Sequence, residues 1–567
     1  MERFYKAIIK YKIPILILVL TIPAIVPLLR SGFFHFSDEP QIANLYQMVR
    51  AIGSGQIPPR WAPDMSFGYG YPLFNFYYPL PFYLGTVFYY LTGSLVASLK
   101  LLFIITVPLS AYFMYKWLRL HTNKFNSLIG VIVYTYTPYR AVDLYVRGAL
   151  GELFSFVFFP LTAYLTYRVV KKGRFCDVGL LGITVALFVL SHNLAPLFFL
   201  PWVGLYALVM VIGGSALKNL IKVTVGFSLG LLGSAYFWLP ALIEKANLVG
   251  QTPFNYLDHF PFIKQLIFSP WGYGASHPGI YDDISFQIGL SNWALIISLL
   301  IIVYKGRENI KSLIFPIYFL ISIVFVVFLM NIRSAPLWEL SSLAAYIQFP
   351  WRLLLLTTFL TSCLVIFINS KKVFPKVFLI IIALLSIANS LVYFKPSEYF
   401  NPNDEYFLNR FFANRTTSGT REELSLDYSN YSEDYLLLPL WTKQRPSLLP
   451  GSKIFSSEVE VFDIQEVSPV NYSAKVNSLT GGKISVATYY YPGWKVEVDG
   501  DVSVIEIDEP HGNISFTVAE GNKDIHVYWS ETPFRKVANY LSVIGFLTAS
   551  YLVFGTKIKK LWKEKNI

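Results

Sequence analysis

The sequence has little charge and almost no cysteine, and each shortage excludes a class of protein. Charged residues make up 14% of the 567 residues, against about 25% in an ordinary soluble domain. A cytosolic globular enzyme is therefore excluded. The two cysteines, Cys176 and Cys363, are too few for a disulfide framework or a thiolate zinc site.

Several motifs that mark common enzyme classes are also missing. The sequence contains no Walker A, Rossmann, G-x-S-x-G or H-E-x-x-H pattern, which argues against a nucleotide-driven pump. It also contains no basic run interleaved with aromatic residues. Nucleic acid is therefore not an expected partner, although the net charge is +12.

What the sequence has in abundance is apolar surface, with 54% hydrophobic residues and a mean hydropathy of +0.47. Apolar stretches long enough to cross about 30 Å of hydrocarbon recur along the chain. They predict a polytopic α-helical membrane protein with about twelve transmembrane helices. The first has no cleavage site after it and is typical of a retained signal anchor. The predicted spans are 13–29, 96–115, 126–145, 153–170, 176–192, 195–213, 221–241, 287–304, 312–330, 352–370, 374–394 and 537–556.

Clusters of lysine and arginine between these stretches predict the orientation. With twelve crossings every cluster falls on one side, which the positive-inside rule makes cytoplasmic. Both termini then lie in the cytoplasm, and the protein lies in the cell membrane. The segment 76–92 must rest on the outer surface for this to hold, as Pro79 and Pro81 suggest. The clusters are 1–12, 116–124, 168–174, Lys218 with Lys222, 305–311, 371–376 and 557–565.

Residues 395–535 differ from the rest, because their net charge is −9 while the remainder carries +21. We expect an extracytoplasmic β-sandwich here, between a transmembrane domain over 1–394 and a final helix with a basic tail over 536–567. The transmembrane domain has a long first outer loop over 30–95. Within the β domain, Asp499-Gly500 predicts a tight hairpin turn. Alternating runs predict strands at 454–463, 483–491, 494–498, 503–507, 513–518 and 524–530.

Two adjacent carboxylates, Asp38 and Glu39, open the first outer loop. At a membrane boundary one can accept a proton while the other binds a metal or orients an acceptor. Alternatively, Ser37 or Asp38 caps a helix that begins at Pro40. Spacing alone leaves both roles open.

Arginines at the outer helix ends are candidates for gripping a phosphate. Arg147 and Glu152 belong to the run 145–152, which follows Arg140 and Asp143. The structural alternative is an ion pair, either Arg147–Glu152 or Arg140–Asp143. Another candidate is Arg352, which could meet a phosphate or merely anchor to lipid headgroups.

The remaining polar candidates carry weaker signals. His192 lies where two apolar helices meet, and a structural histidine is the alternative to a ligand or base. The second long loop adds candidates for an acceptor site or a metal, although their spacing matches no metal motif. They are His259, His277, Asp282 and Asp283.

A polytopic chain with an acidic pair at the start of a long first outer loop resembles the GT-C glycosyltransferases, which use polyprenyl-phosphate-linked sugars. Three segments resemble a bacterial branch whose family label refers to 6-pyruvoyl-tetrahydropterin synthase. They are PPRWAPDMSFGYGYPLFNFYYPLPFYLG (58–85), YVRGALGE (145–152) and SHNLAPLFF (191–199). A fourth, YYYPGWKVEVDG (489–500), is similar to the C-terminal β domain of YfhO-like membrane proteins.

The resemblance implies that a sugar passes with inversion from polyprenyl phosphate to an envelope glycan, lipid or protein. It implies Asp38 as the general base, with Glu39 positioning the acceptor or a cation. The implied donor phosphate ligands are Arg147, Arg352, Arg140 and Arg60, and the acceptor-side or secondary residues are Glu152, His192, Asp282 and Asp283. GT-C members vary in metal dependence, so a divalent cation such as Mg²⁺ or Mn²⁺ stays open.

A non-catalytic transporter or assembly factor for lipid-linked or envelope polysaccharide is the alternative. Transporters usually bury ionisable groups at mid-membrane and show internal repeats. In this sequence the charged candidates gather at outer helix ends and no repeat is visible. That distribution favours the enzyme.

Overall fold

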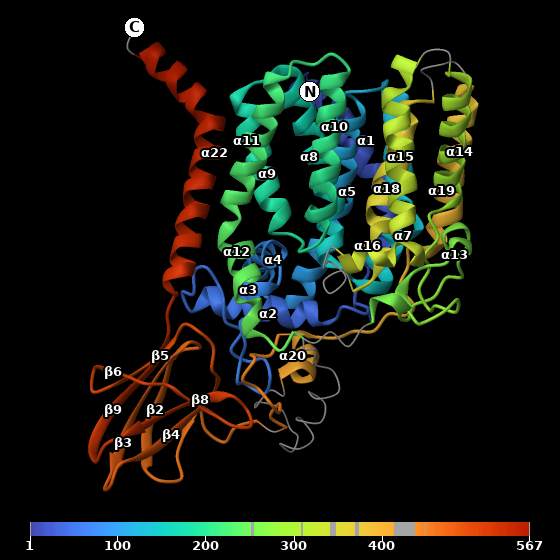
Figure 1. Cartoon of the computed structure of the whole chain (residues 1–567). Helices are drawn as coiled ribbons and strands as arrows, with labels where there is room; N and C mark the ends of the chain where they lie inside the picture. Colours follow the sequence, from blue (N-terminus) through green and yellow to red (C-terminus); the bar gives the residue numbers. More distant parts are fainter. Residues whose placement is uncertain are drawn as a thin grey trace.

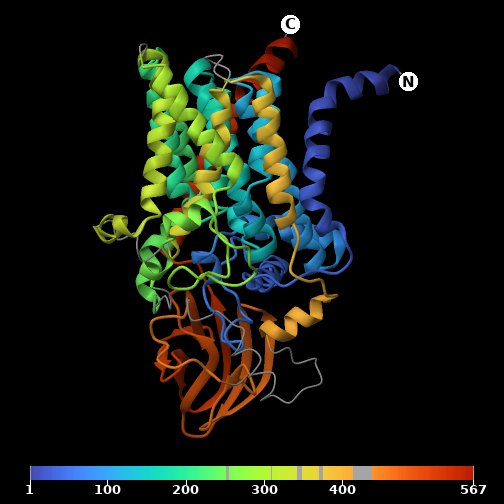
Figure 2. The ribbon, with the colours of Figure 1, turned by 90° about the vertical axis from the view of Figure 1, so that its right-hand side faces the viewer.

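The molecule consists of a bundle of long helices with a β domain at one end, as two perpendicular views show (Figure 1, Figure 2). For residues 2–11, 310–311 and 556–565 the computed structural model describes the backbone alone. The model describes residues 2–250, 255–307, 310–340, 348–368, 374–412, 437–447 and 449–565.

The bundle is built from apolar helices that coincide with the predicted spans. Among the described residues, six helices are long and apolar enough to cross a membrane. They are α1 (Glu2–Leu29), α5 (Leu95–Leu118), α8 (Leu150–Lys172), α10 (Ala195–Ile212), α19 (Lys376–Ser390) together with the 3-10 turn η8 (Leu391–Tyr393), and α22 (Pro533–Lys565). The number rises to eight if two sharply bent pairs each count as one span. These pairs are α11 (Lys218–Gly233) with α12 (Ala235–Glu244), and α15 (Ile314–Leu329) with α16 (Ala335–Leu340).

The prediction of a multi-pass helical membrane protein is confirmed. The other predicted spans are shorter or broken helices, so the number of twelve transmembrane helices stays a prediction. The span predicted over 126–145 is interrupted before Pro138, which has no backbone N–H for a helical hydrogen bond. Its pieces are α6 (Lys124–Thr135), α7 (Pro138–Ala141) and the π-helix η1 (Val142–Arg147). The remaining spans are α9 (Phe175–Val189), α14 (Leu290–Lys305) and α18 (Leu354–Ser362) with its flanking 3-10 turns.

The end of the bundle that carries the β domain also carries the short helices of the first outer loop (Figure 1). The helix α4 has 13 residues, which reach about 20 Å and cannot cross the hydrocarbon core. This length agrees with the expectation that 76–92 lies along the surface. The loop contains α2 (Pro40–Gly53), α3 (Leu73–Phe76) and α4 (Leu80–Thr92).

The opposite end of the bundle carries the basic clusters that the structure describes. The turn from α8 to α9 and the turn from α10 to α11 lie at that end, as do the start of α1 and the end of α22 (Figure 1). The expectation that these clusters share one side therefore agrees with the fold. Lys371 and Lys372 lie outside the described residues, as do the side chains of the first and last clusters up to residue 11 and from residue 556.

The β domain is a pair of antiparallel sheets, in the strand orders β1-β4-β8-β7 and β2-β3-β9-β5-β6. The hairpin predicted at Asp499-Gly500 is confirmed, because Val498 pairs with Asp501 across a two-residue turn. The strands are β1 (Ile454–Phe455), β2 (Glu460–Ser468), β3 (Asn471–Ser478), β4 (Gly482–Tyr489), β5 (Trp494–Val498), β6 (Asp501–Ser503), β7 (Glu506–Asp508), β8 (Asn513–Val518) and β9 (Gly521–Trp529).

Three details of the predicted strands were wrong. The predicted strand 454–463 is divided between β1 and β2, which belong to different sheets. Strand β3 was not expected, because its buried positions Tyr472, Ala474 and Val476 alternate with polar residues in a weakly hydrophobic run. The predicted strand 503–507 is divided between β6 and β7, which belong to different sheets. Chain direction at such corners depends on packing between the sheets rather than on local alternation.

A buried glutamate joins the β domain to the bundle. Glu244, the last residue of α12, receives hydrogen bonds from Arg535 Nε at 2.8 Å and Arg535 Nη2 at 2.9 Å. Asn75 of the first outer loop donates to it at 3.0 Å, and the Tyr491 hydroxyl at 3.3 Å. Three parts of the chain that are distant in sequence therefore share one carboxylate.

A second buried arginine, Arg60, strengthens the same junction. It donates to Glu531 at 3.0 Å, to the Tyr236 carbonyl oxygen at 2.7 Å and to Asn539 at 2.9 Å. The neighbouring residue Trp61 packs against two tryptophans of the β domain, Trp494 and Trp529. The first outer loop is therefore held firmly between the β domain and α22.

The helix α22 continues from this junction along α12, α9 and α11. Its approach is close enough to require glycine. A Cβ atom on Gly179 would lie 2.4 Å from the Ala549 carbonyl oxygen, and one on Gly545 would lie 2.6 Å from the Gly233 nitrogen. Such contacts allow helix backbones to pack tightly inside a membrane.

Candidate functional site

The position of Asp38 is set by the π-helix η1, which belongs to a different part of the chain. The backbone N–H of Asp38 donates to the Arg147 carbonyl oxygen at 2.8 Å, and that of Ser37 to the Val146 carbonyl oxygen at 3.0 Å. Gly148 follows with φ +64°, and a Cβ there would lie 2.1 Å from the Phe36 ring. Glycine therefore allows the two segments to meet.

Arg147 is the centre of a buried cluster of charges. Its Nη1 donates to Asp143 Oδ1 at 2.8 Å and to Glu152 Oε1 at 2.7 Å, and its Nη2 lies 4.0 Å from Asp38 Oδ2. The guanidinium also lies over the Trp351 ring, 4.8 Å from its centroid. Arg147, Asp143 and Glu152 are all buried, so removing one would leave a buried charge unpaired.

Arg352 lies beside Glu152 and is more accessible. Its Nε is 3.6 Å from Glu152 Oε1, its Nη1 donates to Gln348 at 3.1 Å, and 22% of its side chain is exposed. Glu152, His192 and Arg352 lie beside a small pocket of ≈ 20 Å³, whose accessible surface is almost entirely apolar. Its remaining wall is apolar, and the pocket has room for little more than one water molecule. That wall consists of Leu194, Ala195, Phe198, Leu353 and Leu355.

His192 and Tyr78 bring two further predicted segments to this place. The Nδ1 of His192 accepts the backbone N–H groups of Leu194 and Ala195, both at 3.0 Å. The neutral ring therefore carries its proton on Nε2. The Tyr78 ring stacks on His192, and its hydroxyl accepts the Gly151 N–H at 3.2 Å. Three of the segments that carry the family resemblance thus meet here: 58–85, 145–152 and 191–199.

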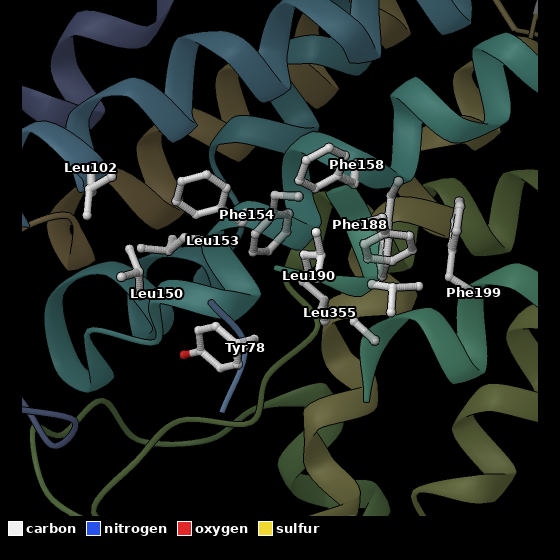
Figure 3. Close-up of a cluster of buried hydrophobic side chains, with 14 of the residues drawn as sticks. Tyr78, Leu102, Leu150, Leu153, Phe154, Phe158, Phe188, Leu190, Phe199 and Leu355 are labelled. Carbon is white, nitrogen blue, oxygen red and sulfur yellow. The ribbon is translucent and has the colours of Figure 1, made fainter. Parts of the chain in front are cut away.

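A layer of buried apolar side chains separates these polar groups from the interior of the bundle. Figure 3 shows Tyr78 below this layer. Its labelled members come from α5, α8, α9, α10, α18 and the turn after α9, and they are fully buried or nearly so. Because such a layer excludes water, charge interactions at its edge are stronger than in solvent. The labelled members are Leu102, Leu150, Leu153, Phe154, Phe158, Phe188, Leu190, Phe199 and Leu355.

The surroundings of Asp38 tune its protonation. Its side chain keeps 36% of its surface accessible, yet protein atoms enclose it closely. This desolvation raises the pKa of Asp38 above its usual value, while Arg147 and Arg352 oppose the rise. A carboxyl group with a raised pKa is a stronger base once it is ionised.

Glu39 contacts His35 and Arg410 rather than the Arg147 cluster, although it is next to Asp38 in sequence. Its Oε1 lies 2.7 Å from His35 Nδ1 and its Oε2 lies 2.8 Å from Arg410 Nη1, on α20 (Asp404–Phe412). The expectation that Ser37 or Asp38 caps the following helix is wrong. Glu39 is the N-cap residue of α2 and no side chain caps the helix, because the main chain of 37–38 is bonded to η1.

Arg140 and Arg60 are not brought to the cluster. Arg140 is fully buried in the bundle, where it donates to Ser110 Oγ and lies 4.5 Å from the centroid of the Phe156 ring. Arg60 uses its donors in the junction with the β domain. Of the two ion pairs considered from sequence, Arg147–Glu152 is formed, and the described residues show none between Arg140 and Asp143.

The acidic pair of the second long loop belongs to a local network. Asp282 accepts from Gln265 at 2.6 Å and from the His277 N–H at 2.9 Å, and Asp283 lies 3.0 Å from His277 Nε2. Within the described parts of the chain, no three His, Cys, Asp or Glu side chains converge in a way that could hold a metal ion. The described charged groups that act on Asp38 are Arg147, Arg352 and Glu152, and a divalent cation at this site stays a prediction.

Three residues of the site were missed from the sequence. The Tyr139 hydroxyl donates to Glu152 Oε2 at 2.6 Å, Trp351 covers Arg147, and Tyr78 lies on His192. Tyr78 lies inside the segment 58–85 and Trp351 directly precedes Arg352, but aromatic residues are so frequent in this chain that neither stood out. A signal was available in Tyr78, because it falls within one of the segments that resemble the family.

Comparison with known families finds a match in the middle of the chain. Residues 77–238 match the family model described as dolichyl-phosphate-mannose-protein mannosyltransferase, a family of the GT-C superfamily. The match confirms the resemblance to GT-C membrane proteins. It covers Tyr78, Arg147, Glu152 and His192 and stops short of Arg352.

One curated relative and two solved structures are also similar. An uncharacterized protein of Lactococcus lactis subsp. cremoris (strain MG1363) is 28% identical over 254 residues, which are 43% of this chain and 41% of that protein. The match thus spans less than half the length of the relative.

The solved structures are more distant. Arabinofuranosyltransferase AftD from mycobacteria aligns over 69% of this chain and 27% of its own, at 12% identity and a TM-score of 0.44. An oligosaccharyltransferase of Archaeoglobus fulgidus aligns over 81% of this chain and 62% of its own, at 16% identity and a TM-score of 0.46. Both scores are below 0.5, so no conclusion is drawn from them.

Proposed function

We propose that this protein is a membrane glycosyltransferase that moves a sugar from a polyprenyl-phosphate-linked donor to an acceptor at the β-domain end of the bundle. One observation carries the proposal. A partly accessible carboxylate, two arginines and a small apolar pocket meet where three family-like segments converge. A lipid-borne donor needs no nucleotide site, which agrees with the lack of nucleotide-binding motifs in the sequence.

The donor phosphate is proposed to bind beside this pocket. Arg352 offers N–H groups there, and the prenyl chain would have to widen the apolar wall of Leu194, Phe198 and Leu355, because the pocket has room for little more than one water molecule. Arg147 is already held by Asp143 and Glu152, so its part is to fix the cluster and to stabilise charge that develops near Asp38.

The chemical step follows from these positions. Asp38 removes the proton from an acceptor hydroxyl as the hydroxyl oxygen attacks the anomeric carbon from the face opposite the phosphate. The new carbon–oxygen bond forms while the bond to the phosphate oxygen breaks, so the configuration inverts. Polyprenyl phosphate leaves with the electron pair, and Arg352 stabilises its charge. Glu152 and His192 line the pocket and can position the substrates.

The acceptor and the location belong to the same proposal. An envelope glycan, lipid or protein would approach from the first outer loop and the β domain, which we place outside the cytoplasmic membrane, with both termini in the cytoplasm. A cysteine introduced at position 94, after α4, should react with a membrane-impermeant reagent added from outside. Labelling only from inside would overturn this orientation.

The direct test replaces the base. Asp38→Asn should lower sugar transfer from polyprenyl-phosphate donors in membranes by at least about 100-fold, as expected for loss of a general base. Asp501→Asn, an exposed carboxylate of the β domain, is the matched control and should keep full activity. Full activity of the Asp38 variant would remove it as the base. If the wild-type protein transfers no sugar from any donor, a transporter or assembly factor is favoured.

A further inference from the structure

The end of the bundle opposite the β domain carries a dense set of cations, which we call the basic rim. It lies on the ends of α5 and α8 and on the starts of α6, α9 and α11 (Figure 1). The only acidic side chain among them in the described chain is Asp177, which is fully buried. The basic rim consists of Lys116, Arg119, Lys124, Arg168, Lys171, Lys172, Arg174, Lys218 and Lys222.

Most of these cations have no carboxylate partner within the part of the chain whose side chains are described. Within the described residues, the ion pair of the basic rim is Arg168 with Asp177, at 2.5 Å. Lys222 donates to the Gly173 carbonyl oxygen at 2.6 Å, which leaves its charge uncompensated. Like charges so close together repel, and an anion bound among them would relieve the repulsion.

Two of the cations converge on one aromatic ring. Lys116 Nζ, on α5, and Arg168 Cζ, on α8, each lie 5.5 Å from the centroid of the Tyr164 ring. Arg168 also donates to the Tyr164 hydroxyl at 3.4 Å. The ring therefore brings together a lysine and an arginine from neighbouring helices. Orientation in the membrane requires positive charge on this side, but it does not require two cations to share one ring.

Large apolar side chains lie exposed beside these cations. Phe175, Leu217 and Ile221 are 58%, 67% and 67% exposed, and Lys222 Nζ lies 5.2 Å from the centroid of the Phe175 ring. The basic rim is at the ends of membrane helices, at the depth of the lipid headgroups. A ligand that presents an anion and an apolar chain together matches this surface better than a soluble acidic protein does.

We propose that the basic rim retains an anionic phospholipid, whose phosphate lies at the ends of α5 and α8, where Lys116 and Arg168 meet at the Tyr164 ring and Lys171 and Lys172 form the last turn of α8, and whose acyl chains run along the bundle. Basic pockets between helices recognise such headgroups by charge. The site is independent of the candidate catalytic site, which lies at the other end of the bundle.

The test compares lipid retention by two variants with the same change in charge. The first combines Lys116→Gln, Lys171→Gln and Lys172→Gln. The control combines Lys264→Gln, Lys395→Gln and Lys536→Gln, three exposed lysines on the loops and helix start near the β domain. Arg168 is left intact because its removal would strand the buried Asp177. Each protein is placed in nanodiscs of phosphatidylcholine, with and without phosphatidylglycerol.

Two measurements decide the outcome. Native mass spectrometry should show phosphatidylglycerol retained by the wild type and the control, with at least half of it lost in the first variant. The rise in Tm caused by phosphatidylglycerol should fall by at least half in the same variant. Equal retention and equal Tm shifts in all three proteins would overturn the proposal.

Two further arms identify the source of the anion. Inorganic phosphate, added to phosphatidylcholine nanodiscs, should not reproduce the rise in Tm, and a full reproduction would make the site one for free phosphate. No preference for phosphatidylglycerol in either measurement would also overturn the proposal and leave a soluble acidic partner as the occupant.

Discussion

Arg147 and Arg535 are both buried arginines bonded to a glutamate, but their surroundings differ. Arg535 forms a bidentate pair with Glu244 and lies over the Trp529 ring, 4.7 Å from its centroid. Arg147 is shared between Asp143 and Glu152 and reaches Asp38 only at 4.0 Å. The first arrangement is closed, whereas the second borders a pocket and a partly accessible carboxylate. Burial and charge alone therefore do not mark a site, whereas a partly accessible carboxylate and a pocket beside the buried charges do.

The largest effect is expected where the closed arrangement is broken. Glu244→Gln should lower the free energy of unfolding by about 3–5 kcal/mol, because Arg535 is left buried and unpaired. Thermal unfolding in detergent measures the loss. Glu509→Gln removes an exposed pair with Lys443 and should change stability by less than about 1 kcal/mol. Equal losses in both variants would mean that the junction is no stronger than a surface contact.

A change in the open arrangement should affect activity more than stability. Arg352→Lys keeps the charge but loses the fork that matches a phosphate, so transfer should fall by about 10- to 100-fold, which corresponds to about 1.4–2.7 kcal/mol in activation free energy. The Tm should stay close to that of the wild type, because Arg352 lies at the rim of the pocket. Sugar transfer and thermal unfolding of the same preparation check this. A large fall in Tm with unchanged activity would reverse the roles assigned to the two centres.

The smallest effect concerns pH. Asp38 must be ionised to act as a base, and Arg352 lowers the pKa of Asp38. Arg352→Gln removes this effect, so the pKa rises and the acid limb of kcat/KM moves to higher pH, by up to about one unit. Arg352→Lys keeps the charge and should leave the limb unchanged. An identical limb in both variants would show that Arg352 does not act on Asp38.

The sequence predicted the class of fold well, because apolar length and charge sidedness are local properties. The helices, the acidic β domain and the hairpin at Asp499-Gly500 all follow from such patterns. The break before Pro138 is also a local property, because proline lacks the backbone N–H of a helical hydrogen bond. The strand at Tyr472 was missed because its burial depends on pairing with a distant strand rather than on its own hydrophobicity.

The candidate site was predicted only in part, because sequence shows which arginines exist and not what surrounds them. Arg60 and Arg147 both lie in family-like segments, yet one joins domains and the other joins carboxylates. The separation of Asp38 from Glu39 was equally hidden, since it depends on Arg410, more than half the chain away. Neither the different roles of Arg60 and Arg147 nor the separation of Asp38 from Glu39 can be predicted from the local spacing of residues in the sequence.

The close packing of α22 against α9 and α11 affects the order in which the helices can assemble during synthesis. The glycines that receive it, Gly179 on α9 and Gly233 on α11, are translated before the β domain, whereas α22 is translated after it. During synthesis the surface of α9 and α11 that α22 later covers must therefore be covered by lipid or by an insertion factor until the β strands have been made. Only then can the last helix replace its temporary neighbour, so this part of the bundle is completed late in biogenesis.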